Sequence, residues 1–270
     1  MTTIRHRGTR VCRLSFRKGP TSEVVVTMSY GRAATRLTVV EKSMNTNCTR
    51  PKALTRLSRS LVLGGLIALL VAARAADAPP INVAFVLTAG ANVIDMTGPW
   101  EVFQDTMAGD QSAFQLFTVG ESTSPVTMSG GLRAVPNYTF ENAPHADIVV
   151  IGAQQGQGAP VLLEWLRARA RDSRVVMSVC TGAYKLARVG LLDGKKATTH
   201  HDFWDEFAKT FPKVQLVRGS RFVQSDDVIY TAGGLTSGID LALHIVEKFY
   251  GPDTADRTAV HMEYHRRDRD

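Results

Sequence analysis

The chain has little cysteine, with 3 residues in 270, at Cys12, Cys48 and Cys180. No two of them have the Cys-x-x-Cys spacing that is typical of zinc and redox sites, and the 7 histidines do not fall at ligand spacing. The sequence therefore predicts no metal site, and we expect no cofactor. Long apolar runs are missing as well. The most apolar stretch has 13 residues, whereas a membrane-spanning helix needs about 20.

That apolar stretch, Leu61 to Ala73, fits an export signal. Arg56 and Arg59 precede it as a positive region, and Ala73-Arg74-Ala75 places small residues at the two positions that a signal peptidase examines. We therefore expect a signal peptide over residues 44–75 that ends near Ala75. The mature protein would be periplasmic or secreted, without stable membrane insertion. An uncleaved membrane anchor is the alternative.

Residues 1–43 are unusual for such a signal, because its positive region is normally short. Met44 would give a presequence of ordinary length, so we expect translation to start there rather than at Met1. Residues 1–43 are then an upstream over-extension or a disordered basic segment. They show no convincing periodicity.

Positive charge is concentrated at the front of the chain. Residues 1–75 hold 14 Lys and Arg against 2 Asp and Glu, whereas residues 76–270 hold 18 against 23. The basic pI therefore belongs to the presequence, and the mature part is mildly acidic. This removes the main argument for nucleic-acid binding, and we expect a small-molecule partner.

Cys180 is the single cysteine of the mature part, which can therefore form no internal disulfide. It follows the β-branched run that starts at Val175 and precedes a helix-like segment. A strand that enters a helix through one tight turn projects its turn residue over the sheet edge, beside the first free N–H groups of the helix. We interpret Cys180 as a nucleophile on such an elbow. A buried cysteine that acts as a small hydrophobe is the alternative.

The pattern over residues 76–270 indicates one domain of the α/β class. Apolar strands that alternate with helices are typical of a parallel sheet covered on both faces. Strands are expected at 81–87, 114–119, 132–137, 147–151, 174–179, 214–217, 222–224 and 228–231. Helices are expected at 98–107, 161–171, 181–189, 203–210 and 237–249, the last of which is the final helix.

Asp95 is the second candidate residue, in the loop that follows the first strand. By position alone it is a helix N-cap ahead of Pro99, a role far commoner than that of a catalytic acid.

Four ordered blocks carry a resemblance to a known family. They are Ile94-Asp95-Met96-Thr97-Gly98-Pro99-Trp100-Glu101-Val102-Phe103, Ser178-Val179-Cys180-Thr181-Gly182-Ala183, the stretch from Ala187 to His200, and the stretch from Thr231 to Leu243. The chain resembles the ThiJ/PfpI superfamily of class I glutamine-amidotransferase-like proteins. Within it, the chain resembles the branch of isonitrile hydratases and of the sensor domains of AraC-type regulators.

The resemblance implies a flavodoxin-like α/β sandwich with a mostly parallel sheet, usually as a homodimer. It places Cys180 on a nucleophile elbow, with Asp95 beside it from the first strand–helix loop. Thr181 occupies the position that holds threonine in the hydratase branch and histidine in the protease branch. Backbone N–H groups of Gly152 and Thr181 are the candidates to stabilise developing negative charge. His200 would line the pocket, and His201 replaces a tryptophan of the branch.

The resulting hypothesis is an exported cysteine-dependent enzyme, most similar to an isonitrile hydratase and therefore a lyase. Asp95 would act as acid while Cys180 forms a thioimidate, and Thr181 would hold the attacking water. Two other functions stay open: a non-enzymatic ligand-binding or sensor protein, and a thiol redox or carbonyl-damage protein of the same fold. His200 could equally be a hydrogen-bonded core histidine.

Overall fold

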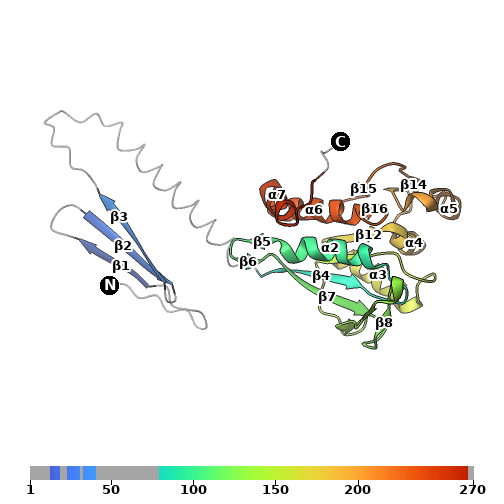
Figure 1. Cartoon of the computed structure of the whole chain (residues 1–270), viewed down its shortest axis with the longest axis horizontal. Helices are drawn as coiled ribbons and strands as arrows, with labels where there is room; N and C mark the ends of the chain where they lie inside the picture. Colours follow the sequence, from blue (N-terminus) through green and yellow to red (C-terminus); the bar gives the residue numbers. More distant parts are fainter. Residues whose placement is uncertain (1–12, 19–22, 31–32, 41–78, 267–270) are drawn as a thin grey trace. The chain divides into compact units, whose positions relative to one another are not determined.

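The computed structural model describes residues 13–18, 23–30, 33–40 and 79–266, and the chain divides into two compact units, Met1–Leu66 and Ile67–Asp270 (Figure 1). The expected signal peptide at 44–75 lies outside the described residues, so export stays a prediction.

In the first unit, three strands form an antiparallel sheet in the order β1 (Arg13–Lys18), β2 (Glu23–Tyr30) and β3 (Ala33–Val40). That residues 1–43 are an upstream over-extension or a disordered basic segment stays a prediction. The strand segments include β-branched runs such as Val24-Val25-Val26, and residues of this kind favour extended backbone.

A seven-stranded sheet forms the centre of the second unit. Every neighbouring pair in it is parallel except the last, in which β15 runs antiparallel to β16. The expected α/β class is therefore confirmed. In spatial order the strands are β10 (Tyr138–Thr139), β7 (Phe114–Gly120), β4 (Ile81–Val86), β11 (Ile148–Ile151), β12 (Val175–Val179), β16 (Ile229–Ala232) and β15 (Phe222–Gln224).

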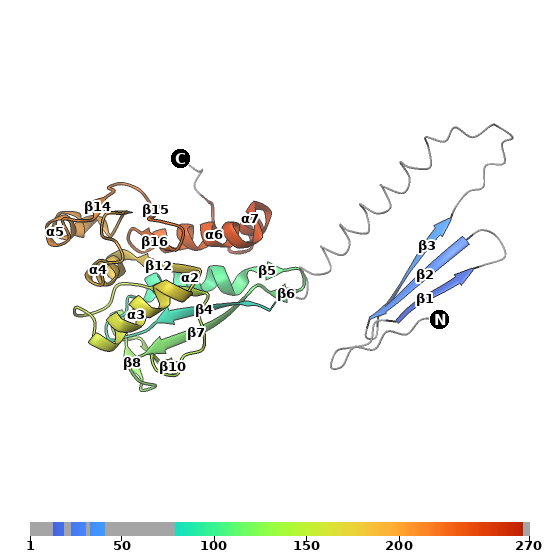
Figure 2. The same cartoon turned by 180° about the vertical axis from the view of Figure 1, so that it is seen from behind.

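Helices cover both faces of this sheet (Figures 1 and 2). One face carries α2 (Val93–Asp105), α6 (Ser237–Tyr250) and α7 (Pro252–His261). The other face carries α3 (Pro160–Asp172), α4 (Ala183–Arg188) and α5 (Trp204–Thr210). Short antiparallel or parallel pairs lie outside the main sheet: β5 (Met107–Ala108) with β6 (Gln111–Ser112), β8 (Val126–Thr127) with β9 (Arg133–Ala134), and β13 (Lys196–Ala197) with β14 (Gln215–Leu216).

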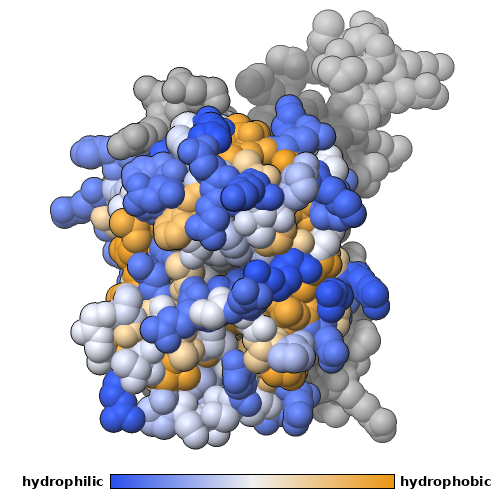
Figure 3. Space-filling view, turned by 90° about the vertical axis from the view of Figure 1, so that its right-hand side faces the viewer, coloured by the Kyte–Doolittle hydropathy of each residue, from blue (hydrophilic) through white to orange (hydrophobic). Residues whose placement is uncertain are grey.

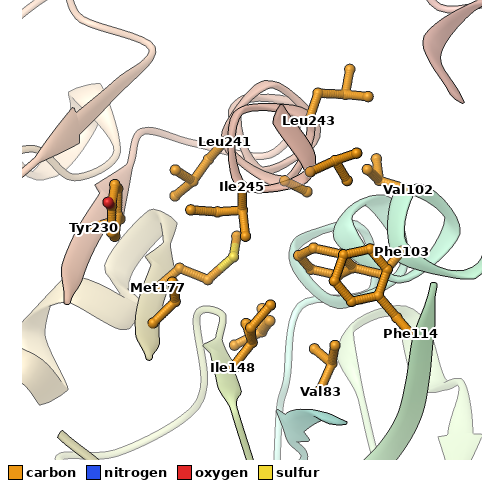
Figure 4. Close-up of a cluster of buried hydrophobic side chains, with 14 of the residues drawn as sticks. Val83, Val102, Phe103, Phe114, Ile148, Met177, Tyr230, Leu241, Leu243 and Ile245 are labelled. Atoms are coloured by element: carbon orange, nitrogen blue, oxygen red, sulfur yellow. The ribbon is translucent and has the colours of Figure 1, made fainter. Parts of the chain in front are cut away.

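The central strands of this sheet are rich in apolar residues along their whole length, because both faces of these strands are buried. In β4, Val83 and Phe85 belong to the core under α2 and α6, and Ala84 and Val86 belong to the core under α3 and α4. Figure 4 shows the first core, where side chains of the sheet meet those of α2 and α6. Apolar burial at about 25 cal/mol per Å² favours this two-sided arrangement.

The predicted helices differ from the structure at two places, the start of α2 and the unpredicted helix α7. The first helix begins at Val93 rather than at residue 98, so Pro99 lies inside it and Asp95 is in its first turn rather than at an N-cap. Proline usually favours the start of a helix, so Pro99 predicted a start that is five residues too late. The last helix is α7, which the sequence argument did not predict. Its buried residues are small, mainly Ala and Thr, so its apolar face gives a weak periodic signal.

The strand prediction at 132–137 was also wrong in extent. The structure has β9 at Arg133–Ala134, and β10 begins only at Tyr138. The described helices include none with the length and apolar character that crossing a membrane requires.

Close approach of α2 to α6 places the two helices over the end of β12. A Cβ added at Gly238 would lie 3.0 Å from Val179 and 3.1 Å from Pro99, and one added at Gly98 would lie 3.1 Å from Ile239. Glycine at both positions therefore lets α2 pack tightly above the strand that leads to Cys180.

Candidate active site

Cys180 occupies a strained turn at the carboxyl end of β12. Its φ is +58°, in the left-handed region that residues other than glycine seldom adopt. The turn continues into the short helix η2 (Cys180–Gly182) and then α4. Two hydrogen bonds hold it: the Cys180 N–H donates to the Gly233 carbonyl at 2.7 Å, and the Thr199 hydroxyl donates to the Cys180 carbonyl at 2.9 Å. The geometry is that of a nucleophile elbow.

Gly182 lets the elbow sit against the neighbouring strand β11. A Cβ at this position would lie 2.2 Å from the Ile151 carbonyl oxygen and 2.9 Å from that of Gly152. Backbone cannot move aside by that much, so a side chain is excluded here. The start of the helix therefore packs directly on the end of β11.

Asp95 comes to the same place from α2 and is fully buried. Its Oδ2 accepts a hydrogen bond from the Ala153 N–H at 2.9 Å, and the Cys180 thiol donates to the carboxyl group. Its Oδ1 is buried without a hydrogen bond of ordinary geometry among the described residues.

Burial raises the proton affinity of both the Asp95 carboxyl and the Cys180 thiol, and the Asp95 charge raises that of the thiol further. Burial raises the pKa of Asp95 to about 6, an effect that the Ala153 N–H and the Cys180 thiol reduce only in part. Burial, together with the Asp95 charge, raises the pKa of Cys180 to about 12, although the Thr181 N–H at the helix start acts in the opposite direction. Near neutral pH the pair therefore holds one proton, and that proton is on sulfur.

Leu235 is a site residue that the sequence argument missed. It follows β16 and has a φ of +56°. Its backbone N–H faces both Asp95 and Cys180 and lowers the pKa of each. The preceding Gly233-Gly234 pair signals a special backbone after the strand, but the direction of one N–H group depends on the whole loop.

The structure places the other expected residues around this pair. Thr181 is half-buried, and its N–H acts on the Cys180 sulfur. Gly152 lies against Asp95, where an added Cβ would be 2.7 Å from the Asp95 Cβ. Its role as an N–H donor stays a prediction. His200 packs on Gly234, where a Cβ would lie 1.9 Å from the imidazole Cδ2.

Comparison with known proteins gives the family. The sequence profile of the DJ-1/PfpI family matches residues 81–248. The chain belongs to the DJ-1/PfpI family.

Two proteins of known name are similar to about two thirds of this chain. The isonitrile hydratase of Pseudomonas putida is 33% identical over 189 residues, which cover 68% of this chain and 78% of that enzyme. The HTH-type transcriptional regulator GbdR of Pseudomonas aeruginosa is 28% identical over 193 residues, 69% of this chain and 52% of the regulator. The chain thus spans about half the length of this regulator.

Solved structures of the DJ-1/PfpI family show the same fold. A ThiJ/PfpI family protein from Pseudomonas syringae matches with a TM-score of 0.61 at 27% identity, over 71% of this chain and 77% of that one. Drosophila melanogaster DJ-1beta matches with a TM-score of 0.60 at 16% identity, over 69% of this chain and all of that one, which shows a shared fold alone. The expected flavodoxin-like sandwich is confirmed.

Two cavities lie at the carboxyl edge of this DJ-1/PfpI sheet, on either side of the Asp95–Cys180 pair in the strand order. One of about 390 Å³ is lined by Leu235, His200 and Trp204, among others. The other, of about 640 Å³, lies at the loops after β4 and β7 and is rich in hydroxyl groups, such as those of Thr88 and Ser129. Figure 3, which looks onto this end of the molecule, shows a mostly hydrophilic surface with small apolar patches.

One side-chain group in the part of the chain that the structure describes could hold a metal ion. His200, His201 and Asp202 place one ligand atom each within 4.8 Å of one another. This group differs from the prediction of no metal site, which rested on the lack of ligand spacing among the histidines and of a Cys-x-x-Cys pair.

Proposed function

We propose that this protein is a cysteine-dependent hydratase that adds water to a small isonitrile, and therefore a lyase. The observation that carries the proposal is the buried Asp95–Cys180 pair at the elbow, which holds one proton at neutral pH. The 33% identity to an isonitrile hydratase supports the choice of substrate class.

The first step forms a thioimidate on Cys180. The Asp95 carboxylate takes the thiol proton, and the sulfur attacks the terminal carbon of R–N≡C. The same carbon then receives the proton from Asp95, which gives R–N=CH–S–Cys180. A pKa of about 6 for Asp95 suits both halves of this transfer, because the group is ionised at rest and gives up a proton readily. N–H groups of Thr181 and Leu235 stabilise the transient thiolate.

The second step releases the product. A water molecule held beside Thr181 attacks the thioimidate carbon while Asp95 moves one of its protons to the substrate nitrogen. The resulting R–NH–CH(OH)–S–Cys180 then loses sulfur as the hydroxyl proton returns to it. The products are the N-substituted formamide and the Cys180 thiol, so the sum is one isonitrile plus one water.

A redox role is less well supported by the same geometry. Oxidation of cysteine follows thiolate character and exposure, whereas Cys180 is 7% exposed and its pKa is about 12. A sensor role has one specific argument in its favour, the 28% identity to the regulator GbdR. It is the second candidate function: a protein that binds a small ligand beside Cys180 without turnover.

The location and assembly of the enzyme are part of the proposal. The presequence over residues 44–75 supports export to the periplasm or beyond, and the excess of acidic residues in 76–270 supports a small-molecule partner rather than nucleic acid. We expect a homodimer by resemblance to the family.

Formamide production from a simple alkyl isonitrile tests the proposal. The purified protein is compared with Cys180→Ala and Asp95→Asn, and we expect turnover in the parent alone. Absence of turnover in the parent, together with tight binding of an unreacted small ligand, would select the sensor function instead. A circular dichroism spectrum of each variant separates lost chemistry from lost folding.

A further inference from the structure

A histidine pair and one carboxylate converge at the edge of the smaller cavity. Asp202 Oδ2 lies 3.6 Å from His200 Nδ1, and Asp202 Oδ1 lies 3.3 Å from His201 Nδ1. The two imidazole rings have their centroids 4.4 Å apart and stand at 80° to each other. The three side chains therefore present nitrogen and oxygen atoms to one small volume.

These spacings suit a tetrahedral metal ion. With ligands at about 2.0–2.2 Å from Zn²⁺, neighbouring ligand atoms stand roughly 3.4 Å apart, close to both observed distances. All three ligand atoms lie within 4.8 Å of one another, so a small rotation of the exposed His201 and Asp202 side chains closes the set. Two imidazoles and one carboxylate form a donor set that is found in zinc sites with an open position.

The backbone around His200 orients the Nδ1 atom of this residue as a candidate ligand. His200 precedes the short helix η3 (His201–Phe203), and its Nδ1 accepts a hydrogen bond from the Asp202 N–H at 3.3 Å, near the long limit for such a bond. That nitrogen therefore carries its lone pair in this arrangement, and a metal ion would replace a weak bond. The contact of the ring with Gly234 limits its movement.

We propose that His200, His201 and Asp202 bind a divalent transition-metal ion of the Zn²⁺ class at the mouth of the cavity beside Cys180. The site is separate from the Asp95–Cys180 pair and does not depend on the proposed hydration. His200 and Leu235 line the same cavity, so a ligand that approaches Cys180 from this side would pass the open coordination position of the ion.

Titration of the full chain with Zn²⁺ against a chromophoric chelator tests the site. The matched variants are His201→Ala and Asp202→Asn, whose side chains are 62% and 71% exposed, so that folding is not at risk. We expect one ion per chain to be lost, or bound roughly tenfold or more weakly, in each variant. Equal binding by the parent and both variants would overturn the proposal.

Two controls identify the ligands. His261→Ala removes another exposed histidine, which lies 3.9 Å from Asp105 and is not part of the His200–His201–Asp202 group, and we expect no change. Cys180→Ala should also retain the ion. Loss of the ion in Cys180→Ala, or a sulfur-to-metal charge-transfer band with Co²⁺, would assign the ion to the thiol and contradict the proposal.

Discussion

Gly152 and Asp95 are in direct contact, since a Cβ at residue 152 would lie 2.7 Å from the Asp95 Cβ and 3.5 Å from its Oδ2. The contact joins the end of β11 to the first turn of α2. It leaves the Asp95 carboxyl group within reach of the Ala153 N–H and the Cys180 thiol. The position of the acid therefore depends on a residue that itself contributes no side chain.

Replacing that glycine should displace the acid. Gly152→Ala forces Asp95 and α2 outward, and a misplacement of about 1 Å can reduce a reaction rate by about 100-fold. Overpacking should also lower the free energy of unfolding by about 1–3 kcal/mol. Turnover and thermal unfolding of the variant measure the two effects.

Gly109→Ala is the matched control. Nothing lies within 4 Å of a Cβ at Gly109, whose φ is +66°, so the change adds backbone strain alone. We expect a loss of stability without loss of turnover. If both variants lose turnover in proportion to stability, the Gly152–Asp95 contact has no specific role.

The Asp95 carboxylate should destabilise the folded protein. Its pKa is about 6 in the folded state against 3.8 normally, so the native state binds the proton more tightly. The free energy of unfolding therefore falls as pH rises from about 4 to about 6, by an amount on the order of 3 kcal/mol. Urea unfolding at pH 4 and pH 7 should show this fall in the parent and not in Asp95→Asn. An identical pH dependence in both would mean that Asp95 is not the group responsible.

The same substitution should make Cys180 more reactive toward an alkylating probe. The negative charge of Asp95 contributes to the raised pKa of the thiol, so Asp95→Asn lowers that pKa. Each unit of decrease gives about tenfold more thiolate at pH 8. The rate of iodoacetamide modification should therefore rise while turnover falls. A slower modification in the variant would show that the Asp95 charge does not raise the pKa of the Cys180 thiol.

Lys185 should change the pH dependence of stability in the opposite direction. Its side chain is 3% exposed, its ammonium donates to the Gln154 carbonyl at 2.9 Å, and burial lowers its pKa to about 8 from 10.5. The native state therefore releases a proton more easily, and stability rises with pH from about 8 to about 10.5.

Lys185→Met removes the buried charge and the hydrogen bond together. At pH 7, removal of the buried Lys185 charge should stabilise the folded state by about 3 kcal/mol. Loss of the hydrogen bond to the Gln154 carbonyl should cost about 1–2 kcal/mol, so we expect the variant to be more stable at this pH. Above about pH 10 Lys185 is neutral in the parent, so only the cost of the lost hydrogen bond remains and the parent should be the more stable protein. Thermal unfolding at both pH values measures the crossover, and a constant difference would show that the pKa of Lys185 is not lowered in the folded state.

Local pattern was enough to predict several elements and the elbow. The strands at 81–87 and 174–179 and the helix at 161–171 were each found within two residues, because buried parallel strands and amphipathic helices have distinct periodicities. The start of α2 was not found, because Pro99 indicates a helix start locally while the contact with α6 and β11 extends the helix back to Val93. Helix α7 was not predicted because the residues on its buried face are small, and small residues give a weak periodic pattern of hydrophobicity.

By itself, the sequence determined the α/β class, since apolar segments with strand and helix periodicity alternate along the chain. The resemblance of four ordered motifs to the family predicted that Cys180 and Asp95 lie together. The tertiary structure alone decided how those groups interact. Burial set the pKa values of Asp95 and Cys180, and the folded loop after β16 aimed the Leu235 N–H at both. It also brought His200, His201 and Asp202 to the cavity edge. The pKa values and the direction of the Leu235 N–H depend on contacts between segments far apart in the chain, which no local pattern specifies.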